Sequence, residues 1–352
     1  MQRIDRFLKL MNDRGASDFH LTVGRPPMLR SSGSMEVIRY RVINEHDFTE
    51  LLQPIAPPRV WEEFKTGDAD FAYEIPGMSR YRVNLFRQQR GAGAVFRVIP
   101  TKIMTTEQLG LPQQVRRIGN LRSGLVLVTG PTGSGKSTTL AAIIDLINDK
   151  RNLHIITIED PIEFIHPNKR CLVHQREIGS HASSFAEALK AAGREDPDII
   201  LVGEMRDLET IAMALNAAER GTLVFGTLHT NNAAKTMDRV VSVFPASEQE
   251  GIRNVLGETI RAVVAQQLLP KVGGGRIAAL EILFATPAIG NMIREGKNGQ
   301  ITSAIQTGQT QGMIDMDTSL KQLVADGKIT ARAAYEKAID KEQFKSLLGG
   351  EA

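Results

Sequence analysis

The chain has 352 residues, of which 42% are hydrophobic and 24% are charged. This composition is close to that of ordinary globular proteins and excludes a chain that is mostly disordered or fibrous. A single cysteine, Cys171, excludes an intramolecular disulfide framework and a four-cysteine zinc site. The 43 basic and 40 acidic residues leave a net charge of +3, too small to indicate nucleic-acid binding by itself. The length predicts about two domains.

Residues 1–99 predict a small α+β domain that begins with a helix. Ile4, Leu8 and Met11 lie on one helical face, and residues 18–23 alternate like a strand. The later elements expected here are a helical pattern broken by prolines over 46–64, strands over 70–73 and 81–86, a turn at 91–93 and a strand over 94–99. The polar segment 100–112 is expected to be a linker.

Residues 113–352 predict an α/β domain with a mostly parallel sheet. Its expected strands are short, continuous apolar runs, as in strands covered on both faces, and helical patterns separate them. These runs are 125–128, 154–158, 199–202 and 223–227. Gly273-Gly274-Gly275 is expected to be a loop, and from about residue 285 only helices are expected, over 287–295, 319–325 and 330–348.

The N-terminal segment is interrupted by charges every few residues, which argues against a signal peptide. No apolar run approaches the roughly 18 residues that a membrane-spanning helix needs. We therefore expect a cytoplasmic protein whose membrane contact is peripheral and made through a partner.

The sharpest motif is GPTGSGKS at residues 130–137, which fits the phosphate-binding pattern G-x-x-x-x-G-K-[ST] at every fixed position. An apolar strand precedes it and an amphipathic helix follows, as the motif requires. Backbone N–H groups and the helix N-terminus favour a phosphate there. Lys136 is expected to contact the β- and γ-phosphates, and the Ser137 hydroxyl Mg²⁺. The expected nucleotide-binding residues are Thr132, Gly133, Ser134, Gly135, Lys136, Ser137 and Thr138.

Acidic residues follow two of the expected strands, at the sheet edge where ligands bind in open parallel sheets. Of the group Glu159, Asp160 and Glu163, we favour Glu163 as the activator of water, whereas the other two can serve only to shape the loop. Glu204 has the position of a Walker B acid. Gly203 stands where many such motifs have aspartate, so Glu204 and Glu163 are expected to hold Mg²⁺ through water.

His229 follows a third strand and could sense the γ-phosphate or bridge to Glu204; a structural role is the alternative. Five arginines, Arg80, Arg82, Arg87, Arg90 and Arg97, lie between residues 80 and 97, and that stretch contains no acidic residue. Arg80 and Arg82 share one face of a strand. They form either a solvated basic surface or a source of positive charge for a nucleotide.

Four ordered motifs, GPTGSGKST, ITIEDPIEF, DIILVGEMRD and GTLHTNNA, resemble the Walker A motif, aspartate box, Walker B motif and histidine box of the secretion and pilus ATPase superfamily. The flanking segments ASDFHLTVGRPPMLR, YRVNLFRQQ and AIGNMIREGK extend the resemblance to the retraction branch, which acts in twitching motility. Gly290 is a departure, because the family motif AIRNLIRE has arginine at this position.

The resemblance implies a PAS-like N-terminal domain, a RecA-like ATPase domain and a homohexamer at the base of a type IV pilus. It implies that Glu163, Glu204, Lys136, His229, Arg82 and Arg97 serve catalysis, with Arg80 and Arg239 as further arginine contacts. ATP and Mg²⁺ would be the ligands, and an inner-membrane platform protein (PilC-like) would be the partner. ATP binding would close a cleft between the domains, and hydrolysis would reopen it.

Several alternatives remain open from the sequence. A pilus extension or type II secretion ATPase is less expected, because such proteins are usually longer and commonly contain a tetracysteine zinc site. An accessory retraction paralogue shares these motifs. A DNA-translocating motor would need a basic and aromatic binding strip that the sequence lacks. A non-catalytic nucleotide-binding scaffold would need inert Glu163 and Glu204.

Overall fold

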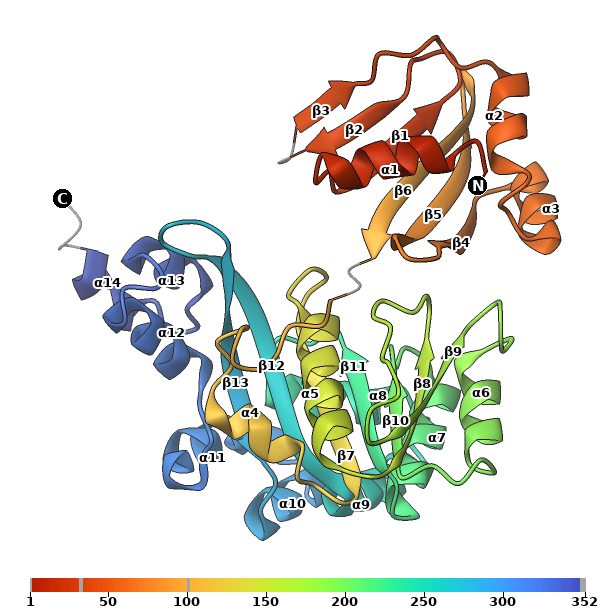
Figure 1. Ribbon diagram of the computed structural model, residues 1–352. Helices are drawn as coiled ribbons and strands as arrows, with labels where there is room; N and C mark the ends of the chain where they lie inside the picture. Colours follow the sequence, from red (N-terminus) through yellow and green to blue (C-terminus); the bar gives the residue numbers. More distant parts are fainter. Residues whose placement is uncertain (1, 32–33, 100–101, 349–352) are drawn as a thin grey trace. The chain divides into compact units, whose positions relative to one another are not determined.

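The computed structural model describes residues 2–31, 34–99 and 102–348 and divides the chain into two compact units, Met1–Lys102 and Ile103–Ala352 (Figure 1). The predicted domain and linker ranges also contain residues 1, 32–33, 100–101 and 349–352, which lie outside the described residues. Within the described residues, no helix is both long and apolar enough to cross a bilayer.

Unit 1 is an antiparallel sheet with the strand order β3-β2-β1-β6-β5-β4, packed with helices. Its strands are β1 Asp18–Thr22, β2 Met28–Ser31, β3 Ser34–Val37, β4 Ala69–Ile75, β5 Ser79–Gln88 and β6 Gly91–Ile99. Its helices are α1 Asp5–Asp13, α2 Glu45–Leu52 and α3 Pro58–Thr66. The buried faces of α1 and α2 pack with the sheet in one hydrophobic core. The predicted α+β organisation is thus found in residues 2–31 and 34–99.

The turn predicted at residues 91–93 is wrong, because Gly91 already begins β6 and the turn lies at Gln89 and Arg90. Gly93 pairs with Phe86 across the two strands. A Cβ at Gly93 would lie 2.5 Å from the Phe86 ring, so the glycine here makes room for an aromatic side chain. The sequence reading also missed β2 and β3.

Unit 2 contains a seven-stranded sheet with the order β13-β12-β7-β11-β10-β8-β9, in which only the β12–β13 pair is antiparallel. The strands are β7 Gly124–Thr129, β8 His154–Glu159, β9 Leu172–Glu177, β10 Ile199–Val202, β11 Leu223–Leu228, β12 Ile260–Pro270 and β13 Arg276–Phe284. The prediction of an α/β chain with a mostly parallel sheet is confirmed.

Helices cover both faces of this sheet and explain its continuous apolar strands. The helices α4 Gln113–Ile118 and α5 Lys136–Lys150 pack on one face. The other face is covered mainly by α6 Phe185–Ala192, α7 Leu208–Glu219, α8 Ala233–Ser242, α9 Gln249–Thr259 and α10 Pro287–Arg294.

The described part of unit 2 after β13 is helical, as predicted, but its helices differ in length and number from those expected. It contains α10, α11 Ile301–Thr307, α12 Met316–Ala325, α13 Ala331–Lys337, α14 Glu342–Leu348 and the short 3₁₀ turns Asn298–Gln300 and Gln309–Gln311. The single helical pattern expected over 330–348 is broken after Lys337. The glycines at 273–275 lie in the loop between β12 and β13, as expected.

Candidate nucleotide-binding site

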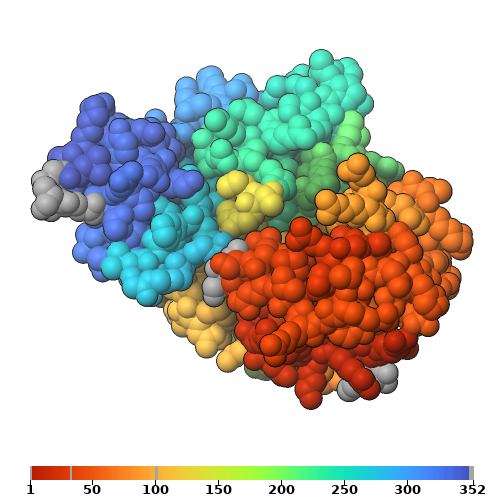
Figure 2. Space-filling view, turned by 90° about the horizontal axis from the view of Figure 1, so that it is seen from above, coloured from red at the N-terminus to blue at the C-terminus, as the bar shows by residue number. Residues whose placement is uncertain are grey.

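The phosphate-binding loop connects the centre of the sheet to a helix. Strand β7 is fully buried and ends at Thr129, the loop occupies residues 130–135, and α5 begins at Lys136. Thr132 and Gly133 are exposed at the tip of the loop, whereas Ser134 is buried. Figure 2 shows this region as yellow atoms at the surface of the molecule. The expected strand–loop–helix context is therefore present.

Lys136 lies at the end of this loop, within electrostatic range of two acidic side chains. The ammonium group of Lys136 donates to the carbonyl oxygens of Gly130 at 2.8 Å and Pro131 at 3.1 Å. Burial lowers the pKa of Lys136, and the negative charges of Glu204 and Glu163 oppose that change. Two acids that are distant in sequence thus act electrostatically on Lys136, and their catalytic roles stay predictions.

Glu204 follows β10 and shares its carboxylate between two cationic or polar partners. Its Oε1 atom lies 2.5 Å from Arg206 Nε and 2.9 Å from His229 Nε2. Burial would raise the pKa of Glu204, but the hydrogen bonds and charges of Arg206 and His229 hold it below the usual value. The expectation that His229 could bridge to Glu204 matches this contact, whereas the sequence reading missed Arg206.

The loop after β8 is held by a second acid, Glu159, whose side chain is directed inward. Glu159 accepts from Thr157 Oγ1 at 2.7 Å, from Gln175 Nε2 at 3.2 Å and from the backbone N–H of Glu163 at 3.2 Å. Burial raises the pKa of Glu159. Glu163 itself is exposed. Glu159 therefore shapes the loop that presents Glu163, which is the role that the sequence left open for it.

Gly203 has a steric reason for lacking the side chain that many Walker B motifs carry. A Cβ at Gly203 would lie 3.2 Å from the Ile158 carbonyl oxygen and 3.3 Å from the Cα of Glu159. An aspartate at position 203 would therefore press against the backbone of β8, the neighbouring strand. The side chain of Glu204 supplies the carboxylate at this strand end instead.

The arginines of unit 1 do not form a purely basic surface, because neighbouring strands supply carboxylates. Arg97 and Arg82 stand directly opposite each other on β6 and β5. Arg97 Nε donates to Asp18 Oδ1 at 2.8 Å, and Arg82 Nε lies 3.6 Å from Asp70 Oδ1. Arg80 lies 3.9 Å from Glu74. In unit 2, Arg239 lies exposed on α8.

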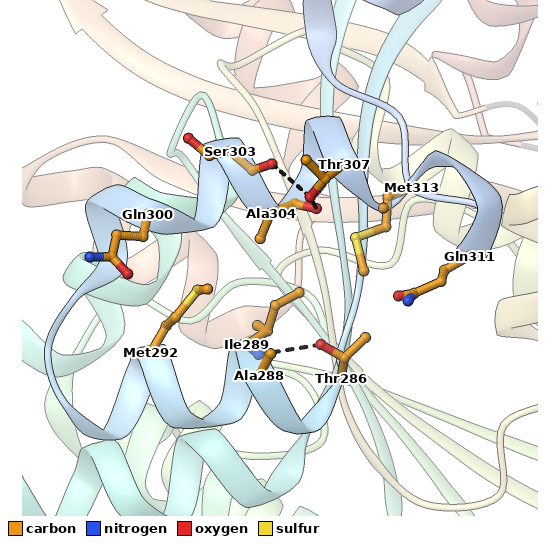
Figure 3. A pocket seen from close by; sticks show the side chains of 11 residues that line it. Thr286, Ala288, Ile289, Met292, Gln300, Ser303, Ala304, Thr307, Gln311 and Met313 are labelled. Carbon is orange, nitrogen blue, oxygen red and sulfur yellow. Dashed lines mark hydrogen bonds between the residues drawn. The ribbon is translucent and has the colours of Figure 1, made fainter.

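The C-terminal helices contain a groove and a close helix crossing away from the phosphate-binding loop. The groove, about 470 Å³ in volume, lies between α10 and α11 and is lined in part by Ile289, Met292 and Met313 (Figure 3). On α10, Gly290 is buried against Gly257 of α9: a Cβ on either glycine would lie 2.8 Å from the carbonyl oxygen of the other. An arginine at position 290 would not fit this crossing.

Comparison with known proteins identifies the family. Residues 58–274, more than half of the chain, match the family described as "Type II/IV secretion system protein". The chain belongs to this family. Two curated relatives are similar to this chain over most of its length. "Type IV pilus retractation ATPase PilT" of Pseudomonas aeruginosa is 53% identical, and the match covers 97% of this chain and 99% of the relative. "Twitching motility protein" of Neisseria gonorrhoeae is 50% identical, and the match covers 90% of this chain and 86% of the relative.

A solved structure supports the same assignment. The crystal structure described as "Pilus Retraction Motor PilT and Bound ADP" has a TM-score of 0.90 and 43% identity, and the match covers 97% of this chain and 98% of that one. This chain is therefore a RecA-like P-loop ATPase with an additional N-terminal domain, as predicted. It binds nucleotide.

Proposed function

We propose that this chain is the ATP-hydrolysing motor of type IV pilus retraction. The observation that carries the proposal is the close similarity of the chain to named retraction proteins over nearly its whole length, and the phosphate-binding loop with Lys136 in electrostatic range of Glu163 and Glu204 supports it. The similarity to these relatives favours retraction over pilus extension, type II secretion and an accessory paralogue.

The phosphates of ATP bind to residues 132–138. The ammonium group of Lys136, which donates to the Gly130 and Pro131 carbonyls, can instead donate to the β- and γ-phosphates. Mg²⁺ prefers hard oxygen ligands, and the Ser137 hydroxyl with the carboxylates of Glu204 and Glu163 provides such donors directly or through water. The metal would polarise the γ-phosphate and neutralise charge on it.

Glu163 accepts the proton of the attacking water, and Glu159 sets the direction of its backbone. Glu204 orients the groups around the γ-phosphate. His229, which follows β11, contacts Glu204 Oε1 and so connects Glu204 to the end of that strand. Arg82, Arg97, Arg80 and Arg239 are the proposed sources of further positive charge during hydrolysis.

The motor is proposed to act as a homohexamer bound to an inner-membrane platform protein (PilC-like) at the cytoplasmic face of the pilus base. Repeated ATP hydrolysis would drive the pilus subunits back toward the membrane. A deletion strain should keep its pili but lose retraction and twitching. A strain without any pili would indicate an extension motor and would overturn the proposal.

Phosphate release by the purified protein tests the chemistry. Lys136→Ala and Glu204→Ala should each lower ATP turnover by at least about a hundredfold while the protein remains folded. The exposed Glu258→Gln on α9 is a matched control that should keep the wild-type rate. Wild-type turnover in either site variant would contradict the site, and wild-type protein without turnover would favour the scaffold alternative.

DNA added to the same assay tests the DNA-translocating motor. We expect no stimulation of turnover, because the sequence lacks a basic and aromatic strip for single strands. Stimulation that falls steeply with salt would favour that alternative.

A further inference from the structure

One buried polar side chain beside the phosphate-binding loop has no role in the site described so far. Gln266 lies on β12, which pairs in parallel with β7 up to Ala265 and Thr129. The side chain of Gln266 is therefore adjacent to the place where β7 ends and the loop begins. Only 3% of Gln266 is exposed.

Both ends of the Gln266 amide are used. Its Nε2 atom donates to the backbone carbonyl of Ser134 at 2.6 Å, and its Oε1 atom accepts from Thr139 Oγ1 at 2.8 Å. The amide thus connects the last part of the loop with the first turn of α5. Buried amide groups that are satisfied in this way hold their neighbours in one arrangement.

Two loop glycines are pressed against the same residue. A Cβ at Gly130 would lie 2.3 Å from the backbone carbonyl oxygen of Gln266, and a Cβ at Gly135 would lie 2.8 Å from Gln266 Nε2. Gly135 also has a φ of 89°, which a residue with a side chain rarely adopts. The glycines therefore allow the loop backbone to reach Gln266, and this contact is a reason for their presence besides phosphate binding.

The bond to Ser134 has a consequence for the next peptide N–H. In a trans peptide the carbonyl of one residue and the N–H of the following residue point to opposite sides. When Gln266 holds the Ser134 carbonyl toward β12, the N–H of Gly135 is directed away from β12. A loop of this kind binds phosphate through such N–H groups.

We propose that Gln266 is a positioning residue that orients the Ser134–Gly135 peptide for the diphosphate group of a nucleotide. It acts through the loop backbone and does not touch the ligand. The inference rests on the proposed function, since it requires nucleotide binding at this loop. The hydrogen bond from Gln266 Nε2 to the Ser134 carbonyl orients the peptide, whereas the hydrogen bond from Thr139 only anchors the amide.

Binding of ADP and ATP turnover test the proposal in the full chain. Gln266→Met has a similar volume and removes both hydrogen bonds. Gln266→Glu keeps an acceptor for Thr139 but loses the donor to Ser134. Each should weaken ADP affinity by about tenfold and raise the KM for ATP similarly, with kcat changed by less than about threefold. Gln266→Glu also serves if Gln266→Met fails to fold.

Two matched variants separate orientation of the peptide from general anchoring. Thr139→Val removes the other hydrogen bond of the amide, and Gln267→Met changes the next side chain, which points to the opposite face of the strand. Both should bind ADP within about twofold of wild type. Wild-type affinity in both Gln266 variants, or equal loss in Thr139→Val, would overturn the proposal.

ADP binding by the wild-type protein distinguishes a failure of the proposed function from a failure of the role of Gln266. Failure of the wild-type protein to bind ADP would overturn the proposed function and the role of Gln266 together. Normal wild-type binding with unchanged Gln266 variants would overturn the role of Gln266 alone.

Discussion

At the scale of single residues, Glu281 shows how burial can set a pH response. This glutamate lies on β13, is 2% exposed and accepts the backbone N–H of Ala233, the first residue of α8, at 2.7 Å. Burial raises the pKa of Glu281 to about 7 from 4.5, and the nearby charges of Asp315 and Asp317 act in the same direction. The carboxyl group thus holds the start of α8, where the segment GTLHTNNA ends.

The raised pKa predicts that Glu281 makes the fold less stable as pH rises. The folded protein retains this proton to a higher pH than the unfolded chain, so its stability contribution is complete below pH 4.5 and is lost as the pH rises to about 7. The total effect is on the order of 3 kcal/mol. Glu281→Gln, which keeps an acceptor, should therefore stabilise the protein more at pH 8 than at pH 5.5.

Urea unfolding at the two pH values measures this difference, which should be about 2 kcal/mol. The exposed Glu258→Gln is the control and should show little pH-dependent change. An equal effect of Glu281→Gln at both pH values would show that the carboxyl group of Glu281 does not titrate in this range.

Arg206 gives a second prediction at this scale. Its hydrogen bond and charge are the largest influences that lower the pKa of Glu204 against the effect of burial. Arg206→Gln should therefore raise the pKa of Glu204. If the ionised carboxylate is required, the acidic limb of the pH profile of kcat/KM should move to higher pH. An unchanged acidic limb would separate Glu204 ionisation from turnover.

At the scale of elements, the two facing arginines of the paired strands β5 and β6 should contribute differently to the stability of the fold. Arg97 donates to Asp18, which is 6% exposed at its side chain, whereas Arg82 lies farther from the exposed Asp70. Burial would raise the pKa of Asp18, but hydrogen bonds from Arg97 and Ser17 hold it below the usual value. Removing Arg97 leaves this buried carboxylate with fewer partners.

Arg97→Ala should consequently destabilise the protein by about 1 kcal/mol, and Arg82→Ala by less than about 0.5 kcal/mol. If both arginines serve hydrolysis, both variants should also lose ATP turnover under conditions where they are fully folded. Thermal unfolding with parallel phosphate release measures the two effects. Turnover lost in folded Arg97→Ala alone would support the predicted role of Arg97 and would contradict that of Arg82.

The sequence predicts some elements better than others for physical reasons. Strands β7, β8, β10 and β11 are recognisable because both faces are buried, which produces continuous apolar runs. β3 is exposed along its whole length, so no apolar pattern marks it. The wrong turn at residues 91–93 arose because glycine usually indicates a turn, whereas Gly93 accommodates the Phe86 ring.

At the scale of the whole molecule, each unit has its own hydrophobic core. One buried cluster lies entirely within unit 1, and the other three lie entirely within unit 2. A fragment from Ile103 to Ala352 should therefore fold cooperatively and bind ADP with near wild-type affinity. Circular dichroism and ADP titration check this expectation. A fragment that is unfolded would show that unit 2 requires unit 1 for stability.

Part of the candidate site was predictable from the topology of the sheet. Parallel strands end at one edge of the sheet, so acids that follow β8 and β10 are expected near the loop that follows β7. Gln266 was not predictable, because its partner Ser134 is 132 residues away and no motif marks the contact. The catalytic roles assigned to Glu163, Glu204 and His229 stay predictions that the proposed variants test.

The crossing of α9 and α10 has a consequence for how this family varies. Gly257 and Gly290 allow the two helix backbones to approach, and neither position has room for a side chain while the other backbone stays in place. An arginine at position 290 would therefore force these two helices to separate or rotate. The two positions should change together during divergence, and an arginine transplanted alone into this chain should be tolerated poorly.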